Sequence, residues 1–98
     1  MDTLGDIIRQ HRDNKALPLR TVAAFLDIDQ AILSKMERGQ RKASREQVVK
    51  LAEYFQMDEE KLLVAWLSDK IVYEISEETF AKDALKVAEQ KIEYLKNM

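Results

Sequence analysis

Residues 21–39 read TVAAFLDIDQAILSKMERG, and this stretch decides the fold of the chain. Apolar residues recur in it at the three- and four-residue spacing of amphipathic helices, first over residues 22–26 and again over residues 33–36. Asp29 is well placed as the N-cap of the second helix, and Gly39 is the kind of residue that ends a helix in the left-handed conformation. We therefore predict two short helices joined by a tight turn of about three residues.

Helical patterns flank this pair on its N-terminal side. The apolar spacing over residues 4–11 predicts a first helix, which Asp2 or Thr3 can cap. Pro18 follows a break at residues 14–17 and suits the first turn of the next helix, because the proline nitrogen has no hydrogen to leave unpaired there.

Helical patterns also continue on the C-terminal side. Ser44 followed by Gln47 matches a capping box, which predicts a fourth helix. Asp58 is placed to cap a fifth helix, whose periodicity continues through Ile75, and Ser76 is placed to cap a sixth. No stretch shows the sustained alternation of a strand. The sequence predicts an all-α fold, a five-helix bundle with an additional C-terminal helix.

Composition and charge limit the chemical classes of partner that this chain can bind. The chain has 98 residues and a formal net charge of −2, which argues against a nucleic-acid partner when it is taken whole. The charge is unevenly distributed, since residues 1–45 carry nine basic and six acidic side chains (+3), and residues 46–98 carry seven and twelve (−5). The basic charge concentrates over residues 35–45, so its distribution favours an anionic partner.

Two classes of protein are disfavoured by the residue types present. The longest apolar run, residues 62–67, is far shorter than the roughly 20 residues of a membrane span, and no apolar leader is visible, so we expect a cytoplasmic protein. With no cysteine and one histidine, the chain offers too few ligands for a catalytic zinc site. We expect no enzyme, no metal and no cofactor, with His11 half-buried in a structural role and Trp66 packed between the fifth and sixth helices.

The predicted helix pair, followed at once by basic residues, is a helix-turn-helix arrangement. From Leu4 to Leu63 the sequence resembles the Xre-type, lambda-repressor-like helix-turn-helix domain of phage repressors and many bacterial regulators. The residues that carry the resemblance are Leu4, Gly5, Ile8, Arg12, residues 22–26, residues 33–39, Leu51 and Ala52. The resemblance implies a five-helix bundle that binds double-stranded DNA, usually as a homodimer on a palindromic operator.

The resemblance also implies roles for individual residues. The third helix, about residues 29–38, would enter the major groove, and its exposed face would contact bases through Gln30, Ala31, Ser34 and Lys35. Phosphates would be held on one flank by Arg20 and Thr21, and on the other by Arg38, Gln40, Arg41 and Lys42. Arg12 and Glu37 match a partly buried salt bridge of the family.

Four residues depart from the family pattern. Asp27 replaces the usual turn glycine, and it tolerates the left-handed conformation better than most residues. Ala43 replaces a common proline, and Leu19 replaces a polar residue that contacts phosphate. Ile32 is apolar at a position that is usually exposed, so it either meets a thymine methyl or packs along the helix.

The C-terminal part leaves the main alternatives open. We expect a DNA-binding domain over residues 1–67 and a helical extension over residues 68–98, which either folds back on the fifth helix or forms a dimer interface. Its seam, with spacings of four, three, four and three, consists of Ala81, Leu85, Ala88, Ile92 and Leu95. Of these, the predicted dimer contacts are Leu85, Ala88, Ile92 and Leu95.

The leading hypothesis is a sequence-specific transcriptional regulator, a homodimeric repressor or autoregulator. A DNA-binding antitoxin is the first alternative, and it requires a protein partner for the acidic C-terminal part. A protein-interaction module that has lost DNA binding is the second, which the total charge and Leu19 favour and the clustered bases oppose.

Overall fold

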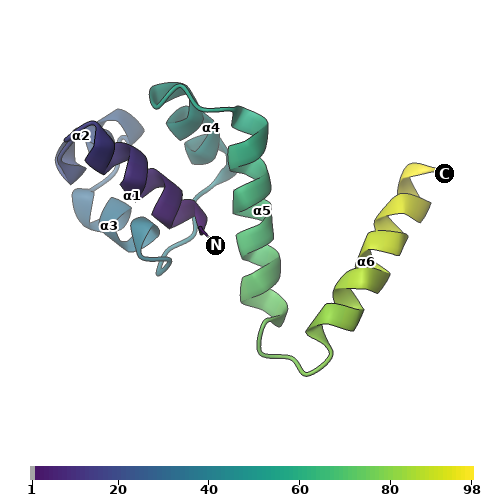
Figure 1. Cartoon of the computed structure of the whole chain (residues 1–98). Coiled ribbons are helices and arrows are strands. Elements are labelled where there is room, and N and C mark those ends of the chain that lie inside the picture. Colours follow the sequence, from purple (N-terminus) through teal and green to yellow (C-terminus); the bar gives the residue numbers. More distant parts are fainter. Residues whose placement is uncertain (1) are drawn as a thin grey trace.

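The computed structural model describes residues 2–98 and contains six α-helices in this range, with no strand between those residues (Figure 1). The helices are α1 (Leu4–Asn14), α2 (Leu19–Leu26), α3 (Gln30–Glu37), α4 (Arg45–Tyr54), α5 (Glu59–Ile75) and α6 (Ala81–Lys96). The all-α prediction is therefore confirmed. Over residues 2–98, no helix is both long enough and apolar enough to cross a membrane.

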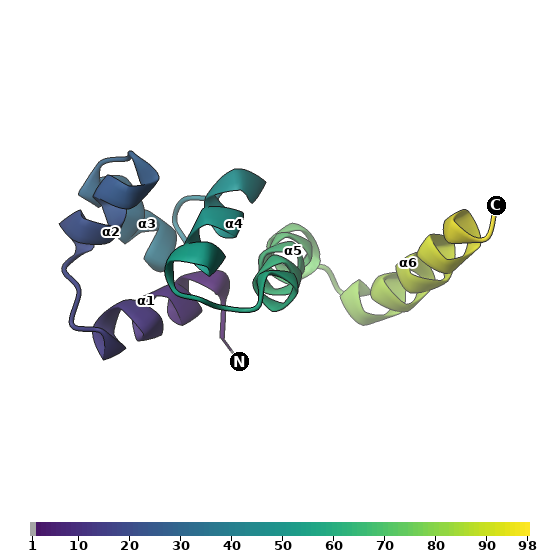
Figure 2. The same cartoon turned by 90° about the horizontal axis from the view of Figure 1, so that it is seen from above.

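Helices α1 to α4 and the first half of α5 form a bundle around one core (Figures 1 and 2). Helix α2 packs on α3, α1 packs on α3 and α5, and α4 packs on α5. The buried apolar side chains are Leu4, Ile8, Val22, Ala23, Leu26, Leu33, Met36, Ala43, Val48, Leu51, Ala52, Phe55, Leu62 and Trp66. They come from all five helices and from the segments just before and just after α4, so this part of the chain has a core of its own.

Three helices of the bundle begin at side-chain caps. Thr3 and Ser44 each form a full capping box, with Asp6 and Gln47 as the respective partners. The Asp58 carboxylate accepts a hydrogen bond from the backbone N–H of Lys61 at the start of α5. Asp29 is the N-cap residue of α3, as predicted, but its side chain makes no capping hydrogen bond.

Four helices of the bundle end in the same way, with one residue in the left-handed conformation. These residues are Ala16, Asp27, Gly39 and Gln56, with φ between 52° and 75°. After each one, the next backbone N–H bonds back to the carbonyl five residues earlier, which is the Schellman pattern. The prediction that Asp27 takes the place of a turn glycine is confirmed, and only one of the four positions is a glycine.

The start of α1 fits closely against two other helices. A Cβ atom added to Gly5 would collide with the backbone carbonyls of Met36 and Glu37, so a glycine lets α1 approach the end of α3. The Asp69 carboxylate on α5 accepts a hydrogen bond of 2.8 Å from the backbone N–H of Leu4. This contact satisfies a free donor at the helix start and ties α1 to α5.

The C-terminal part differs from the sequence prediction in one respect. Helix α5 runs through Ile75, as its periodicity predicts, but Ser76 is the C-cap of α5 and does not begin the next helix. Helix α6 begins at Ala81 after a five-residue connection, and its N-cap, Phe80, makes no side-chain hydrogen bond. The prediction of Ser76 as an N-cap was wrong because α5 continues up to that residue.

Helix α6 lies apart from the bundle and diverges from α5 beyond the connection in both views (Figures 1 and 2). None of the residues of α6, Ala81–Lys96, is buried. Of the two arrangements expected from the sequence, the one in which the extension folds back on α5 is not found in the single chain. Helix α5 is continuous across residues 67 and 68, so the expected division of the chain coincides with no break in secondary structure.

Candidate nucleic-acid interface

Helix α3 has one buried face and one free face. Leu33, Met36 and Glu37 are buried. The four residues predicted to contact bases share the opposite side at helical spacing, Gln30, Ala31, Ser34 and Lys35. Three of these side chains are exposed and Ser34 is half-buried. Helix α3 thus presents short polar groups and one cation to the outside, which is the set of groups that a major groove can match.

The residues predicted to hold phosphates lie in two segments, the first turn of α2 and the stretch from the end of α3 into the following loop. Arg20 and Thr21 are exposed in the first turn of α2. Arg38 is the C-cap of α3, and its Nε donates a hydrogen bond of 3.3 Å to the Ser34 carbonyl. Gln40, Arg41 and Lys42 are exposed in the 39–43 loop that joins α3 to α4. The helix start on one side and the loop on the other therefore offer donors to a phosphate backbone.

Arg12 and Glu37 hold the free face in position. Nε and Nη2 of Arg12 donate hydrogen bonds of 2.8 and 3.0 Å to the two carboxylate oxygens of Glu37, which is 4% exposed. Nη1 of Arg12 donates to the Leu17 carbonyl at 3.0 Å. The hydrogen bond to Glu37 raises the pKa of the Arg12 guanidinium above its ordinary value, so the guanidinium stays charged. This bidentate pair fixes the end of α3 to α1.

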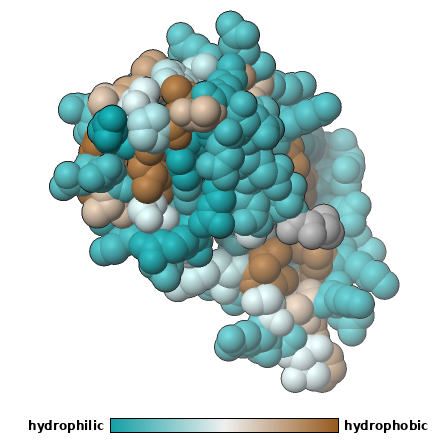
Figure 3. All heavy atoms as spheres, turned by 60° about the vertical axis from the view of Figure 1, so that its left-hand side comes forward, coloured by the Kyte–Doolittle hydropathy of each residue, from teal (hydrophilic) through white to brown (hydrophobic). Residues whose placement is uncertain are grey.

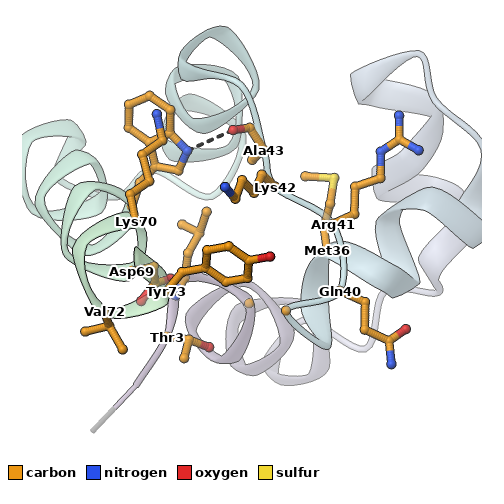
Figure 4. Close-up of a pocket in the computed structure, with 14 residues that line it drawn as sticks. Thr3, Met36, Gln40, Arg41, Lys42, Ala43, Asp69, Lys70, Val72 and Tyr73 are labelled. Atoms are coloured by element: carbon orange, nitrogen blue, oxygen red, sulfur yellow. Dashed lines mark hydrogen bonds between the residues drawn. The ribbon is translucent and has the colours of Figure 1, made fainter. Parts of the chain in front are cut away.

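Trp66 supports the 39–43 loop. Its indole Nε1 donates a buried hydrogen bond of 2.8 Å to the carbonyl of Ala43, drawn as the dashed line in Figure 4. The prediction that Trp66 packs between the fifth and sixth helices was therefore wrong. Trp66 faces the bundle and the loop, because α6 does not cover this part of α5.

A pocket of about 290 Å³ lies between the start of α1, the 39–43 loop and α5 (Figure 4). Tyr73 projects into it from α5, and the Nζ of Lys42 lies 4.4 Å from the centroid of its ring. Around Trp66, Lys70 Nζ lies 3.6 Å and Arg45 Cζ 5.5 Å from the ring centroid. These cation–π contacts bring Lys70 and Arg45, which are not among the predicted site residues, close to the loop that Trp66 supports.

Two residues that depart from the family pattern are used for packing. Leu19 and Ile32 are both partly buried and pack against the core. Of the two hypotheses for Ile32, contact with a thymine methyl or packing along the helix, the structure supports packing. His11 is half-buried as expected, with its ring centroid 5.7 Å from that of Phe55.

A helix-turn-helix family model matches residues 8–62, which is more than half of the chain. The chain belongs to the Xre-type, lambda-repressor-like helix-turn-helix family. The matched range begins in α1 and ends in α5, so it contains the α2–α3 pair and the 39–43 loop. Comparison with curated proteins and with solved structures gave no match.

Family membership supports a DNA-binding transcriptional regulator in general terms. Proteins of this helix-turn-helix class are typically not enzymes. The free face of α3 and the basic loop beside it form the candidate nucleic-acid interface of this family member.

Proposed function

We propose that this protein is a sequence-specific regulator of transcription, a cytoplasmic homodimeric repressor or autoregulator that inserts α3 into the major groove of its operator. The observation that carries the proposal is the free face of α3, which the Arg12–Glu37 pair fixes to α1 and which is accompanied by exposed polar and basic side chains in the first turn of α2 and in the 39–43 loop.

Base recognition is assigned to the side chains on that face. Gln30 has an amide that can pair with the donor and acceptor edge of adenine, and Lys35 can donate to the acceptors of guanine. Ser34 can donate or accept, and the methyl group of Ala31 can meet the methyl group of thymine.

Phosphate binding is assigned to Arg20, Thr21, Arg38, Gln40, Arg41 and Lys42. Salt dependence of binding follows from the positive charge of the four basic residues in this set, because each phosphate that a cation neutralises releases a counterion. Ala43 takes part indirectly, since the hydrogen bond from Trp66 to its carbonyl limits the movement of the loop. The extra cations beside Trp66, Arg45 and Lys70, extend the same basic strip toward α5.

The different roles proposed for the N-terminal and C-terminal parts of the chain support a dimer. Residues 1–67 would read one half-site, and residues 68–98 would join two copies, with Leu85, Ala88, Ile92 and Leu95 among the contacts. Their side chains are exposed in the single chain. Two joined domains reading half-sites about 34 Å apart bind more tightly than one, because the second contact becomes intramolecular.

Selection of bound sites from random duplex DNA tests the proposal. We expect enrichment of one palindromic sequence, whose half-site changes or is lost in the Lys35→Ala variant. Lys86→Ala is the matched control, because Lys86 is an exposed lysine on α6, outside the candidate nucleic-acid interface. Selection with this variant should return the same DNA sequence as the parent protein. Random sequences from the parent protein, with its folding verified by circular dichroism, would contradict base recognition.

The exposed apolar residues of α6 also favour the alternative hypothesis of a DNA-binding antitoxin. An antitoxin would cover this surface with another protein, encoded by a neighbouring gene. Co-purification of such a protein in a fixed ratio, together with an operator in its own promoter, would favour the antitoxin. A DNA-binding homodimer on its own would favour the simple regulator.

A further inference from the structure

Within residues 2–98, nothing in the single chain covers the apolar face of helix α6. Its seam residues Leu85, Ile92 and Leu95 are 46%, 53% and 66% exposed. A lone 16-residue helix is only marginally stable in water, and helices in proteins gain most of their stability from packing an apolar face. Packing against a surface outside the single chain would therefore stabilise α6.

Helix α5 carries a second uncovered apolar face. Leu62 and Trp66 are buried in the bundle, whereas Val64, Leu67 and Ile71 are exposed on other sides of the helix. A helix that is apolar on more than one side is normally covered on more than one side. The side of the molecule seen in Figure 3, which is the bundle side, is mostly hydrophilic, with apolar residues gathered in the lower part of the view.

We propose that the two faces cover each other between two copies of this chain, so that α6 of each copy packs on the outer face of α5 of the other. This inference rests on the homodimer proposed above and specifies how it is built. Each copy would give one helix and receive one, which makes the contact self-complementary around a two-fold axis.

The lengths of the two faces match. From Val64 to Ile75 the outer side of α5 spans about 17 Å at about 1.5 Å per residue, and from Leu85 to Leu95 the seam of α6 spans about 15 Å. The open angle between α5 and α6 in Figure 1 leaves the face of α5 free for a helix from another chain. The two helices can therefore pair over about three turns.

The charges of the two helices are complementary. Helix α5 (residues 59–75) carries four acidic and two basic side chains, a net charge of −2, and α6 (residues 81–96) carries four lysines and three acids, a net charge of +1. Pairing α5 with α5 would bring two acidic helices together. Pairing α5 with α6 of the other copy joins opposite net charges, which lowers the electrostatic cost of association.

Pairing α6 with α6 is disfavoured by the positions that flank its seam. In a parallel pair, Lys91 of one copy faces Lys96 of the other. In an antiparallel pair that opposes Leu85 to Leu95, Lys91 faces Lys91 and Glu89 faces Glu89. Both arrangements place like charges across the contact, and alanines at two seam positions leave little apolar surface to offset them.

The absence of cysteine from the chain permits a direct test. Two single-cysteine variants, Ile71→Cys on α5 and Ala88→Cys on α6, are mixed, with one carrying a tag that changes its mass. A short bismaleimide then joins cysteines that lie close together. Asn14→Cys, at the exposed end of α1, replaces Ile71→Cys in the control mixture.

We expect the 71–88 product between different chains to exceed the control product by on the order of tenfold, because contact raises the effective concentration of the two thiols. Crosslinked products that join only position 71 to position 71, or only position 88 to position 88, would overturn the proposed exchange of α6 between copies. They would still be consistent with a homodimer. A chain carrying both cysteines that is joined within itself would overturn it as well.

Two further measurements separate this inference from the proposed function. Sedimentation equilibrium of the unmodified full chain gives its oligomeric state, and a monomer at all concentrations would overturn both the exchange and the homodimer. Binding of the full chain to a duplex that contains one selected half-site is measured independently by fluorescence anisotropy. Its loss would contradict DNA recognition without bearing on the helix exchange.

Discussion

The bundle and the C-terminal arm of this protein (residues 67–96) are built from the same kinds of residue, yet they are stabilised in different ways. In the bundle, Leu33, Val48 and Leu51 are completely buried, and glycine brings α1 against the carbonyls of α3. In the arm, large apolar side chains such as Ile71 and Leu95 remain exposed. Amphipathic spacing alone therefore does not say whether a helix finds its cover within the chain or outside it.

The largest expected difference comes from one leucine in each region. Leu51→Ala should lower the free energy of unfolding by about 2–5 kcal/mol, because it leaves a cavity in the core. Leu95→Ala should change it by less than about 0.5 kcal/mol in dilute protein, where the arm is unpaired. Urea denaturation of both variants measures the difference. Equal losses at low concentration would show that the arm packs within its own chain.

The buried ion pair should give the next largest effect. Glu37→Gln should destabilise the protein by about 3 kcal/mol, because Arg12 keeps its charge and loses the carboxylate that compensates it. The control is Glu93→Gln on α6, where an exposed glutamate is replaced and a change below about 0.5 kcal/mol is expected. Thermal melts of both variants report the outcome, and similar shifts would remove the special role of the Arg12–Glu37 pair.

Lysines in the two regions should differ in DNA binding. Lys35→Ala should weaken binding to the selected operator by about 1–3 kcal/mol, because a base contact is lost, with little change on unrelated DNA. Lys86→Ala should leave both affinities unchanged. Anisotropy titrations on the two DNA molecules make the comparison. An equal loss on both by Lys35→Ala would reassign that lysine to the phosphate backbone.

Arg41 should act on all DNA sequences alike. Arg41→Ala should weaken binding uniformly and reduce the slope of log affinity against log salt by about one unit, as expected for one lost phosphate contact. Lys91→Ala, which removes a charge from the arm, should leave the slope as it is. Titrations at several salt concentrations give both slopes, and an unchanged slope for Arg41→Ala would exclude this residue from phosphate binding.

The smallest expected effect is the change in stability on replacing alanine by glycine, and its sign should differ between the bundle and the arm. Ala16→Gly should stabilise the protein by about 0.5–1 kcal/mol, because Ala16 has a φ of 52°, a conformation that glycine adopts without strain. Ala84→Gly, inside α6, should instead reduce helicity, since glycine costs about 1 kcal/mol in a helix interior. Circular dichroism with denaturation tests both. A destabilising Ala16→Gly would show that the backbone there is not strained.

The features that were predictable from sequence depend on residues close together in the chain. The capping boxes at Thr3 and Ser44 and the left-handed Asp27 follow from neighbours within a few positions. The free face of α3 also follows from local spacing, because burying Leu33 and Met36 leaves the opposite side outside. The fold class and the placement of the candidate base-reading residues thus both follow from residues that are close together in the sequence.

The features that were missed depend on contacts between distant parts of the chain. Apolar residues occur around the whole of α5, so periodicity cannot say which side Trp66 faces. The approach of Tyr73 to Lys42 joins residues 31 positions apart, and no local pattern predicts it. Ser76 has the chemistry of an N-cap, yet α5 extends to it and uses its backbone instead.

The hydrogen bond between Trp66 and Ala43 gives this protein a built-in optical probe. Trp66 is the single tryptophan of the chain, and its indole N–H is bonded to the loop proposed to hold phosphates. Indole emission depends on such bonds and on nearby charges, here the ammonium group of Lys70. Movement of the loop on DNA should therefore change the intrinsic fluorescence, so that binding can be followed in solution without an attached label.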